Sequence, residues 1–391
     1  MEENKKILFI TKNFPPIIDG VGDYTYHLSI EFSKQYKVDI ITHNPVAKEN
    51  ELINELKMYN IDVHYLNFES KSKQNDLISL VEQISPNWLN LQYVGYSFHP
   101  YGFPFWLVNP LKHFKKNGIK VLLTVHETYI RRNTFKNTLI SLLQQKSLTK
   151  IAKYSNVLIT SIERYAQQLK KNHSNVHVIP IGSNIKPIKF SEDEISFWKE
   201  QHEFSNKKNI LCFGNRNHLF ALSVLKELIQ KDESFCLIIT GKQSHTIEHR
   251  KYIEAEHLQN HVVTTGILEN NELAKYLTAA DLLLLKEKLD LKGRGGVSGK
   301  SGVVAAAITF GLPIFANRGD MTDNFFKHNK NIFFISDNAS QVAQDILTSY
   351  KTGDLEILKI EVQKFKHFNS WHTIVKKAER ILKSCYYSSN A

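Results

Sequence analysis

A glycine-rich segment with two basic residues is the strongest candidate for chemistry in this sequence. It runs from Leu291 to Gly302 (LKGRGGVSGKSG) and leads into Val303–Phe310, a run of helical character rich in small residues. Backbone N–H groups, the positive end of a helix dipole and a cationic side chain converge in such a loop, and together they bind a diphosphate. The segment is not a P-loop, because Arg294 stands five residues before Gly299, where a P-loop requires glycine. We therefore predict a diphosphate site here; the alternative is a flexible solvated loop capped by a serine.

Two further segments place glycine or histidine directly after an expected strand. Gly20 and Gly22 stand in NFPPIIDGVG, and a helix is expected to start near Asp23. Glycine at these positions allows a ligand to approach the backbone closely, although the segment fits an ordinary βα turn equally well. His126 in TVHE ends another expected strand. Its imidazole could bond a sugar hydroxyl or stabilise charge near a reacting centre, and the alternative is a structural role.

An arginine and an aromatic stretch are two further candidates. Arg216 follows the expected strand Ile210–Phe213 and could hold a phosphate through two hydrogen bonds, or it could be an exposed loop residue. The stretch Tyr93–Trp106 (YVGYSFHPYGFPFW) could line an acceptor site or contact a membrane. Packing around a helix that starts near Pro104 is the interpretation that we favour.

The elements that must position these residues follow a repeated pattern. Short apolar runs alternate with longer amphipathic stretches, which predicts βα units around mainly parallel sheets. Pro180, Gly182 and Pro187 interrupt this pattern, and Glu192–Glu194 can open a helix, so we expect two doubly wound domains joined here. The carboxyl ends of both sheets should face a shared ligand cleft. The expected strands are Ile7–Thr11, Val38–Thr42, Val63–Leu66, Trp88–Gln92, Val121–Thr124, Val157–Thr160 and Val176–Ile179, and then Ile210–Phe213, Leu237–Thr240, Val262–Thr264, Leu282–Leu285 and Pro313–Ala316.

Composition excludes several classes of protein. The 391 residues are 42% hydrophobic and 23% charged, which is typical of a globular protein and not of a disordered or disulfide-stapled one. Cys212, Cys236 and Cys385 have no spacing suited to zinc or to a disulfide framework. The net charge of +11 favours anionic partners, but no nucleic-acid-binding motif accompanies it. The start lacks the pattern of a secretory signal, and the apolar run Val303–Ala316 is too short to span a bilayer, so we expect a cytoplasmic protein.

Taken in chain order, these segments resemble the GT-B glycosyltransferases, in particular glycosyltransferase family 4. ILFITKNFPPIIDGVGDYTYHLS is similar to the family's first strand, glycine-rich turn and first helix, and TVHE stands where the family has a histidine followed by an acidic residue. SNVLITSIERYAQQL and IPIGSNI resemble the close of the first domain, and TTGILENNELAKYLTAADLLLL resembles the base-binding loop and the next strand. AAAITFGLPIFANRGDMTDNF and FNSWHTIVKKAERIL complete the series, so the resemblance covers nearly the whole chain.

The resemblance implies a fold and a division of the chain. The fold would be the α/β GT-B fold, with two Rossmann-like doubly wound domains facing a central cleft. Residues 1–183 would bind the acceptor and residues 184–370 the nucleotide-sugar. Residues 371–391 would form a helix that packs back toward the first domain.

The resemblance also implies a reaction and its residues. A sugar would pass from a UDP- or GDP-sugar to a glycan or lipid-linked acceptor, with retention of its anomeric configuration. The reaction would belong to surface polysaccharide or glycoconjugate synthesis and would need no tightly bound cofactor or metal. The implied catalytic residues are His126 and Glu127. The implied nucleotide-sugar-binding residues are Gly20, Val21, Gly22, Arg216, Gly266, Leu268, Arg294, Ser298, Gly299, Lys300, Ser301, Gly302 and Val303.

Two departures from the family pattern favour an alternative. The usual pair of glutamates falls on Ser298 and Ala306, although SGKSG resembles the Ser-x-Arg/Lys-x-Gly loop of some members. The lysine that normally accompanies the arginine at the start of the second domain is also missing beside Arg216, and Lys300 or Arg294 could supply its charge. The alternative is a catalytically silent relative that binds a nucleotide-sugar, a glycan or a partner subunit.

A basic and aromatic surface in the first domain predicts docking at the cytoplasmic face of a membrane. Cationic side chains attract anionic headgroups, and the aromatic stretch ending at Trp106 would lie beside them. The alternative is that these are ordinary solvated faces of two helices. The cationic residues are Lys112, Lys115, Lys116, Lys120, Arg131, Arg132 and Lys136.

Overall fold

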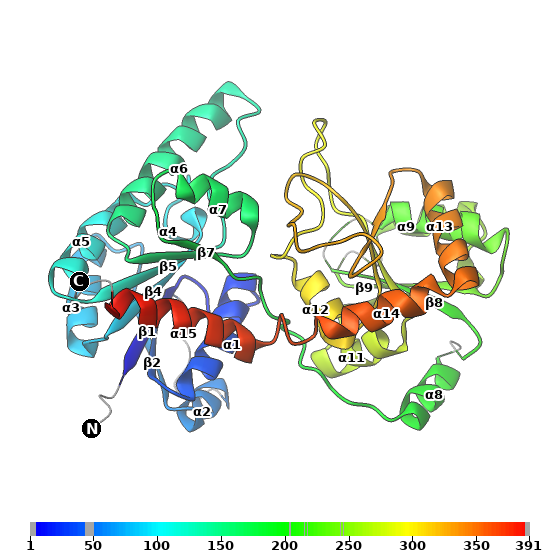
Figure 1. Ribbon diagram of the computed structural model, residues 1–391, viewed down its shortest axis with the longest axis horizontal. Helices are drawn as coiled ribbons and strands as arrows, with labels where there is room; N and C mark the ends of the chain where they lie inside the picture. Colours follow the sequence, from blue (N-terminus) through cyan, green and yellow to red (C-terminus); the bar gives the residue numbers. More distant parts are fainter. Residues whose placement is uncertain are drawn as a thin grey trace. The chain divides into compact units, whose positions relative to one another are not determined.

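The computed structural model describes residues 5–43, 51–202, 205–214, 216, 218–242, 244 and 246–387. The chain divides into two compact units. Unit 1 comprises residues 1–180 and 371–391, and unit 2 comprises residues 181–370. Each unit contains one parallel sheet with helices packed against it (Figure 1).

The sheet of unit 1 has seven parallel strands in the order β3-β2-β1-β4-β5-β6-β7. Its five inner strands are almost continuously buried, as expected for a parallel sheet covered on both faces, whereas the edge strands β3 and β7 are partly exposed. The strand order reverses between β1 and β4, which defines the topological switch point of this unit. The strands are β1 (Lys6–Thr11), β2 (Lys37–Thr42), β3 (Ile61–Tyr65), β4 (Trp88–Tyr93), β5 (Lys120–Val125), β6 (Val157–Thr160) and β7 (Val176–Val178).

Helices α1 and α15 lie together in unit 1, although they are far apart in the sequence. The Trp371 ring stacks on His27 at 5.3 Å between centroids, and His372 Nδ1 lies 3.0 Å from Glu31 Oε1. These contacts assign the last helix to the first unit. The helices of unit 1 are α1 (Gly20–Ser33), α2 (Glu51–Met58), α3 (Lys73–Ile84), α4 (Gly95–Phe98), η1 (Phe105–Leu107), α5 (Val108–Lys116), α6 (Phe135–Lys153), α7 (Glu163–Lys170) and α15 (Trp371–Tyr387).

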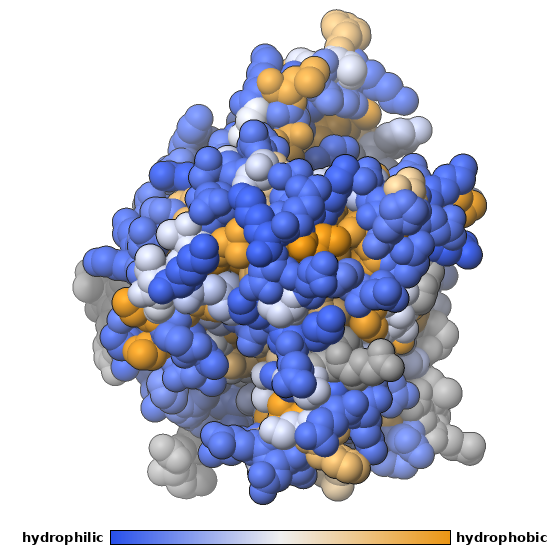
Figure 2. Space-filling view, turned by 90° about the vertical axis from the view of Figure 1, so that its right-hand side faces the viewer, coloured by the Kyte–Doolittle hydropathy of each residue, from blue (hydrophilic) through white to orange (hydrophobic). Residues whose placement is uncertain are grey.

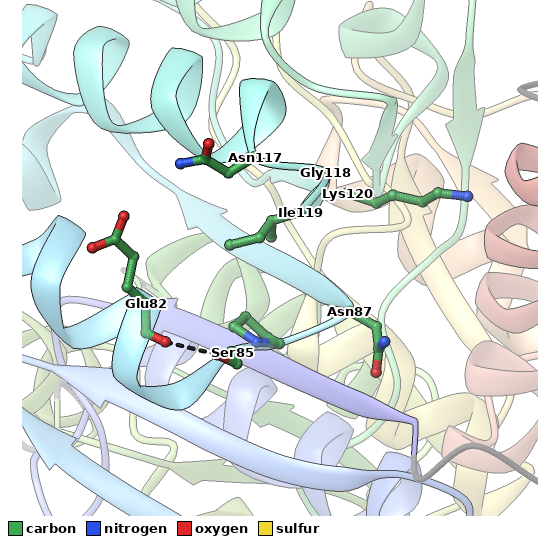
Figure 3. A pocket seen from close by; sticks show the side chains of 8 residues that line it. Glu82, Ser85, Asn87, Asn117, Gly118, Ile119 and Lys120 are labelled. Atoms are coloured by element: carbon green, nitrogen blue, oxygen red, sulfur yellow. Dashed lines mark hydrogen bonds between the residues drawn. The ribbon is translucent and has the colours of Figure 1, made fainter.

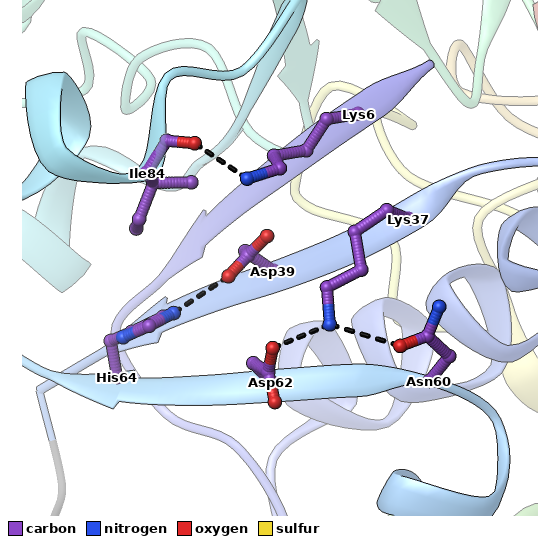
Figure 4. Close-up of polar contacts among 7 residues, drawn as sticks. All are labelled: Lys6, Lys37, Asp39, Asn60, Asp62, His64 and Ile84. Carbon is purple, nitrogen blue, oxygen red and sulfur yellow. Dashed lines mark hydrogen bonds and ion pairs between the residues drawn. The ribbon is translucent and has the colours of Figure 1, made fainter. Parts of the chain in front are cut away.

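Polar side chains connect the outer strands of this sheet (Figure 4). Asp39 on β2 is only 4% exposed, and its Oδ1 lies 2.7 Å from Nε2 of His64 on β3. Lys37 and Asp62 form an ion pair between the same two strands. Lys6 Nζ donates to the Ile84 carbonyl at 2.7 Å and so connects β1 to the end of α3. These contacts connect β2 to β3 and β1 to the end of α3.

The sheet of unit 2 has six parallel strands in the order β10-β9-β8-β11-β12-β13, with its switch point between β8 and β11. Its strands are β8 (Lys208–Phe213), β9 (Phe235–Thr240), β10 (Val262–Gly266), β11 (Leu282–Leu285), β12 (Ile314–Asn317) and β13 (Phe333–Ile335). Its helices are α8 (Glu192–Gln201), α9 (Leu219–Ile229), α10 (Ile247–Ala255), η2 (Gln259–His261), α11 (Asn270–Ala279), α12 (Gly302–Phe310), α13 (Ala339–Thr352) and α14 (Asp354–Lys364).

The predicted fold class, α/β with two Rossmann-like doubly wound parallel sheets, is confirmed, and every expected strand is present. The acidic segment after Ser191 opens α8 as predicted, through a reciprocal capping box between Ser191 and Glu194. Several strand bounds differ by one or two residues; the third strand, for example, begins at Ile61 and not at Val63. The short edge strand β13 was not predicted, and α1 begins at Gly20 and not near Asp23.

The early start of α1 has a local cause. The Asp19 side chain accepts a hydrogen bond from the Gly22 amide at 3.4 Å and so acts as the N-cap. Gly20, Val21 and Gly22 therefore form the first turn of the helix and not the loop before it.

Candidate active site

The switch point of unit 2 carries a pair of opposite charges. Arg216 follows β8 and Glu287 follows β11, and Arg216 Nη2 lies 3.2 Å from Glu287 Oε1. Both side chains are about three-quarters buried, with 22% and 23% of their surface exposed. Because neighbouring parallel strands end at the same edge of a sheet, the pair spans the position where doubly wound sheets bind ligands.

The N-terminus of α12 lies against the end of β8. Gly214 has a φ of +105°, and a Cβ on it would lie 3.1 Å from Cγ2 of Val303 in the first turn of α12. This close approach brings the glycine-rich segment and Arg216 to the same edge of the sheet. The first N–H groups of a helix have no intrahelical acceptor, so those of Gly302 and Val303 are suited to bind an anion. The Ser301 hydroxyl caps this helix by accepting from the Val304 amide.

The segment before α12 is held in place by the loop after β12. Asp323, only 2% exposed, accepts the Gly299 amide at 2.7 Å through Oδ2. At the end of β12, the Asn317 carbonyl accepts the Val297 amide at 3.0 Å. The Asn317 side chain also fixes the turn after β11, because it accepts the Glu287 amide at 2.7 Å and donates to the Glu287 carbonyl at 2.9 Å. Residues 297–299 are buried. The part of the loop next to α12 is therefore ordered by buried hydrogen bonds, which a flexible solvated loop would lack.

The two basic residues of the segment have different surroundings. Arg294 Nε lies 2.6 Å from Asp290 Oδ2, and the same carboxylate accepts the Arg294 amide at 3.0 Å. Arg294 therefore closes the outer part of its own loop, beside the fully exposed Leu291. Lys300 is partly buried and lies two residues before Gly302, where α12 begins. Of the two, Lys300 is the one next to the helix N-terminus.

Gly266 is the last residue of β10, two strands away from β8, and Leu268 follows this strand. Gly266 has a φ of +75°, its amide donates to Ser244 Oγ at 2.9 Å, and its carbonyl accepts the Gly241 amide at 2.7 Å. Leu268 packs against the core of unit 2. These residues lie at the carboxyl edge of the same sheet, beside the end of β9.

A buried histidine that sequence reasoning did not select stands beside Arg216. His218 precedes α9, is 4% exposed and donates its amide to His249 Nε2 at 3.2 Å. Burial lowers the pKa of His218 to about 4, and the positive charge of Arg216 contributes in the same direction. His218 is therefore neutral at physiological pH and adds no charge to this edge of the sheet.

In unit 1, His126 lies where β5 ends. Its amide donates to the Tyr93 carbonyl at 3.0 Å, and its Nε2 lies 2.8 Å from Oε1 of the buried Gln92 on β4. An amide oxygen only accepts, so this contact places a ring proton on Nε2. Glu127, the other predicted catalytic residue, is exposed.

Helix α1 brings its first turns to the same end of this sheet. Tyr24 contacts the His126 ring edge-on at 5.0 Å between centroids, and it also contacts Trp371 at 5.3 Å. The predicted residues Gly20, Val21 and Gly22 precede Tyr24 on this helix. The structure therefore gathers the predicted residues of unit 1 at one edge of its sheet.

The two glycines of α1 should respond differently to alanine. A Cβ at Gly22 would lie 2.9 Å from the Asn13 carbonyl oxygen, whereas a Cβ at Gly20 would meet nothing within 4 Å. We expect Gly22→Ala to lower the free energy of unfolding by about 1–3 kcal/mol because of this steric overlap. Gly20→Ala should leave it unchanged or raise it by up to about 1 kcal/mol, since alanine favours the helix. Urea denaturation measures both, and equal losses in the two variants would contradict the packing argument.

A pocket elsewhere in unit 1 is separate from these residues (Figure 3). Its volume is about 420 Å³. It lies where β4 and β5 begin, at the sheet edge opposite His126, and ligands of doubly wound sheets bind at the carboxyl edge. The lining residues are Glu82, Ser85, Pro86, Asn87, Asn117, Gly118, Ile119 and Lys120.

Two features are absent from the part of the chain that the structure describes. Within those residues, no group of three or more His, Cys, Asp or Glu side chains is arranged to hold a metal ion. In the same part of the chain, no helix has both the length and the apolar character that crossing a bilayer requires.

Part of this chain matches a known protein family in sequence. Residues 194–357 match the family described as glycosyl transferases group 1. This match lies within unit 2 and includes Arg216, Glu287 and the whole glycine-rich segment. A comparison with curated protein sequences finds no significant match.

Solved structures share the fold of the whole chain. Anabaena HepE in complex with UDP is similar with a TM-score of 0.72 and 16% identity, over 97% of this chain and 100% of that one. The sucrose-phosphate synthase of Thermosynechococcus elongatus gives 0.67 and 13%, over 98% and 100% of the two chains. A mutant of S. aureus TarM, in complex with fondaparinux, alpha-GlcNAc-glycerol and UDP, gives 0.67 and 13%, over 96% and 99%.

The fold and the family match define the class of protein. The fold is that of the GT-B glycosyltransferases, and residues 194–357 match the glycosyl transferases group 1 family. The protein is thus a glycosyltransferase, as the sequence predicted.

Proposed function

We propose that the protein moves a sugar from a nucleotide-diphosphate-sugar to an acceptor with retention of anomeric configuration, and that unit 2 binds the donor. The observation that carries this proposal is that the N-terminus of α12 is fixed in position. The buried Asp323 accepts the Gly299 amide, and Val303 packs against Gly214. A fixed set of N–H donors stabilises a departing diphosphate because no reorganisation is needed when the charge develops. HepE structures with UDP and with UDP-glucose support a nucleotide-sugar donor.

Each candidate residue has a role in this proposal. The amides of Gly302 and Val303 hold the diphosphate, and Lys300 and Arg216 neutralise its charge, with Arg216 exchanging Glu287 for phosphate. Ser298, Gly299 and Ser301 shape this turn, while Arg294 stabilises the outer part of the loop through Asp290. Gly266 and Leu268 contact the base of the donor. The donor is a UDP- or GDP-sugar.

Unit 1 supplies the remaining groups. We assign the acceptor to this unit, with His126 acting on the reacting sugar, Glu127 assisting it, and Gly20, Val21 and Gly22 contacting the ligand. The acceptor is a glycan or a lipid-linked glycan of surface polysaccharide synthesis, reached from the cytoplasm. The resemblance to glycosyltransferase family 4 supports this assignment.

A catalytically silent binding protein is the second candidate function. Ser298 and Ala306 replace the usual glutamates, and both positions are buried, at 5% and 0% exposure. No carboxylate is therefore supplied from either position. Such a protein would bind the nucleotide-sugar without releasing the nucleoside diphosphate.

Thermal melting with a panel of nucleotides tests donor binding. We expect UDP or GDP, and the matching sugar nucleotides, to raise the melting temperature more than ADP or CMP. A ligand at 100 times its dissociation constant stabilises the folded state by about 2.7 kcal/mol. No shift with any nucleotide would contradict the donor site. Binding without nucleoside diphosphate release, across a panel of glycan and lipid-linked acceptors, would favour the silent relative.

A further inference from the structure

One face of α6 is exposed along the whole length of the helix. Its first half is apolar, with 89% of Phe135, 55% of Leu139 and 47% of Leu142 exposed. The second half carries the exposed lysines 146, 150 and 153. At about 100° per residue these six positions fall within about 80° of the helix circumference. We call this set the α6 stripe: Phe135, Leu139, Leu142, Lys146, Lys150 and Lys153.

The charge around the α6 stripe has one sign only. Residues 128–162 contain no aspartate or glutamate and six basic residues. This segment therefore has a charge of +6, and the net charge of the whole chain is +11. The basic residues are Arg131, Arg132, Lys136, Lys146, Lys150 and Lys153.

The rest of unit 1 holds α6 firmly. Its inner face, with Leu148, Ile151 and Ala152, belongs to the core of the unit. Gln144 accepts the Ile130 amide at 2.9 Å and donates to the Tyr101 carbonyl at 2.9 Å. The second half of α6 is therefore anchored in the core of unit 1. The start of α6 extends beyond the sheet of unit 1 (Figure 1). On the face seen in Figure 2, hydrophobic side chains are exposed among hydrophilic ones, including at the top of the view.

The surface that the sequence predicted for membrane contact is not formed around Trp106. The indole of Trp106 donates to the Phe98 carbonyl at 3.0 Å and packs against Phe68 and Phe98. Lys120 Nζ lies 3.5 Å from the Cys385 carbonyl oxygen, and burial lowers the pKa of Lys120. The aromatic stretch thus packs largely into the protein, which was the favoured interpretation. In α6, by contrast, exposed apolar side chains and exposed lysines lie on one helix.

We propose that the α6 stripe docks the protein onto an anionic bilayer surface. Phe135, Leu139 and Leu142 extend over about 10 Å of helix, and an interfacial helix buries such an apolar face about 5–10 Å deep in the headgroup region. The lysines of the second half contact the headgroups, and Arg131, Arg132 and Lys136 surround the apolar end. An apolar patch flanked by cations with no acidic residue is complementary to an anionic lipid surface. This inference concerns a surface and not the transfer reaction, so it stands or falls independently of the proposed function.

Co-sedimentation of the full-length protein with vesicles tests this inference. The vesicles contain phosphatidylcholine alone or with phosphatidylglycerol. We expect binding only with phosphatidylglycerol, and weaker binding as salt increases. The triple variant F135S/L139S/L142S should lower the partition coefficient at least about tenfold. The variant K146E/K153E should lower it by at least about fivefold per residue.

Matched variants separate this surface from general effects. I357S/I360S removes two equally exposed isoleucines of α14, each 54% exposed, and K112E/K116E removes two exposed lysines of α5. Both should bind vesicles nearly as well as the unchanged protein, and all variants should melt at similar temperatures. No pelleting at low salt would overturn the proposal. An equal loss of vesicle binding in the α14 variant would also overturn it. If the triple variant still pellets with vesicles but an oligomer dissociates, the stripe is instead a contact between copies of the chain, and the proposal is wrong.

Discussion

Replacing His126 by alanine is expected to lower the rate of sugar transfer by about 100-fold or more, because a positioned acid, base or charge-stabilising group contributes roughly 10²–10⁴ to a rate. His126 stands at the carboxyl end of β5, with Nε2 held 2.8 Å from Gln92. The nucleotide affinity should change little, since the proposed donor site lies in unit 2. A steady-state assay of nucleoside diphosphate release, with calorimetry of nucleotide binding, measures both quantities.

A second histidine provides the control for this prediction. His113 lies in the same unit and pairs with Glu82 on the opposite side of the sheet from His126. His113→Ala should keep nearly full activity. His126→Ala leaves Gln92 without its partner, so a loss of about 1–3 kcal/mol in the free energy of unfolding is expected. Full activity of His126→Ala, or a loss of activity that merely follows the unfolded fraction, would refute the assignment.

Replacing Lys300 by alanine should weaken the binding of the nucleoside diphosphate by about 10-fold to 100-fold. A hydrogen bond to a charged group contributes about 1.5–3 kcal/mol, and Lys300 lies directly before the N-terminus of α12. Calorimetry at fixed salt measures the dissociation constant. Lys292→Ala is the matched control, because Lys292 is an exposed lysine in the same loop. Equal affinities of the two variants would move the diphosphate site elsewhere.

Much of the fold could be predicted because a parallel sheet has a simple sequence pattern. Runs such as LLLL at β11 and VLIT at β6 are buried on both faces, so they read as short apolar segments between amphipathic helices. The edge strand β13 was missed because no helix separates it from β12, so the alternation of strands and helices does not mark it. The start of α1 was misplaced because Asp19 and two glycines read as a turn, although an aspartate is also a frequent N-cap.

The candidate site was predicted only where local sequence specifies it. The segment around Lys300 is visible because glycines and small residues mark a turn into a helix. Asp323 accepts the Gly299 amide and the Asn317 carbonyl accepts the Val297 amide, but both partners are distant in the chain, and nothing local links them to the segment. Gln92 could have been noticed in the sequence, since it and Asn90 are polar residues in a strand that is buried throughout.

The exposed apolar side chains of α6 could not be recognised from periodicity. Apolar residues occur on both faces of this helix, as Leu139 and Leu142 are exposed while Leu148 and Ile151 are buried. A sequence pattern identifies a core face only when the other face is polar. The absence of acidic residues between positions 128 and 162 was the signal available in the sequence.

A crystal structure with the nucleoside diphosphate that most raises the melting temperature tests the central claim most directly. We predict that the diphosphate accepts hydrogen bonds from the backbone amides of Gly302 and Val303, with the Lys300 ammonium and the Arg216 guanidinium within hydrogen-bond reach of its oxygens. A diphosphate bound away from the start of α12, or no bound nucleotide at saturating concentration, would contradict the proposed donor site.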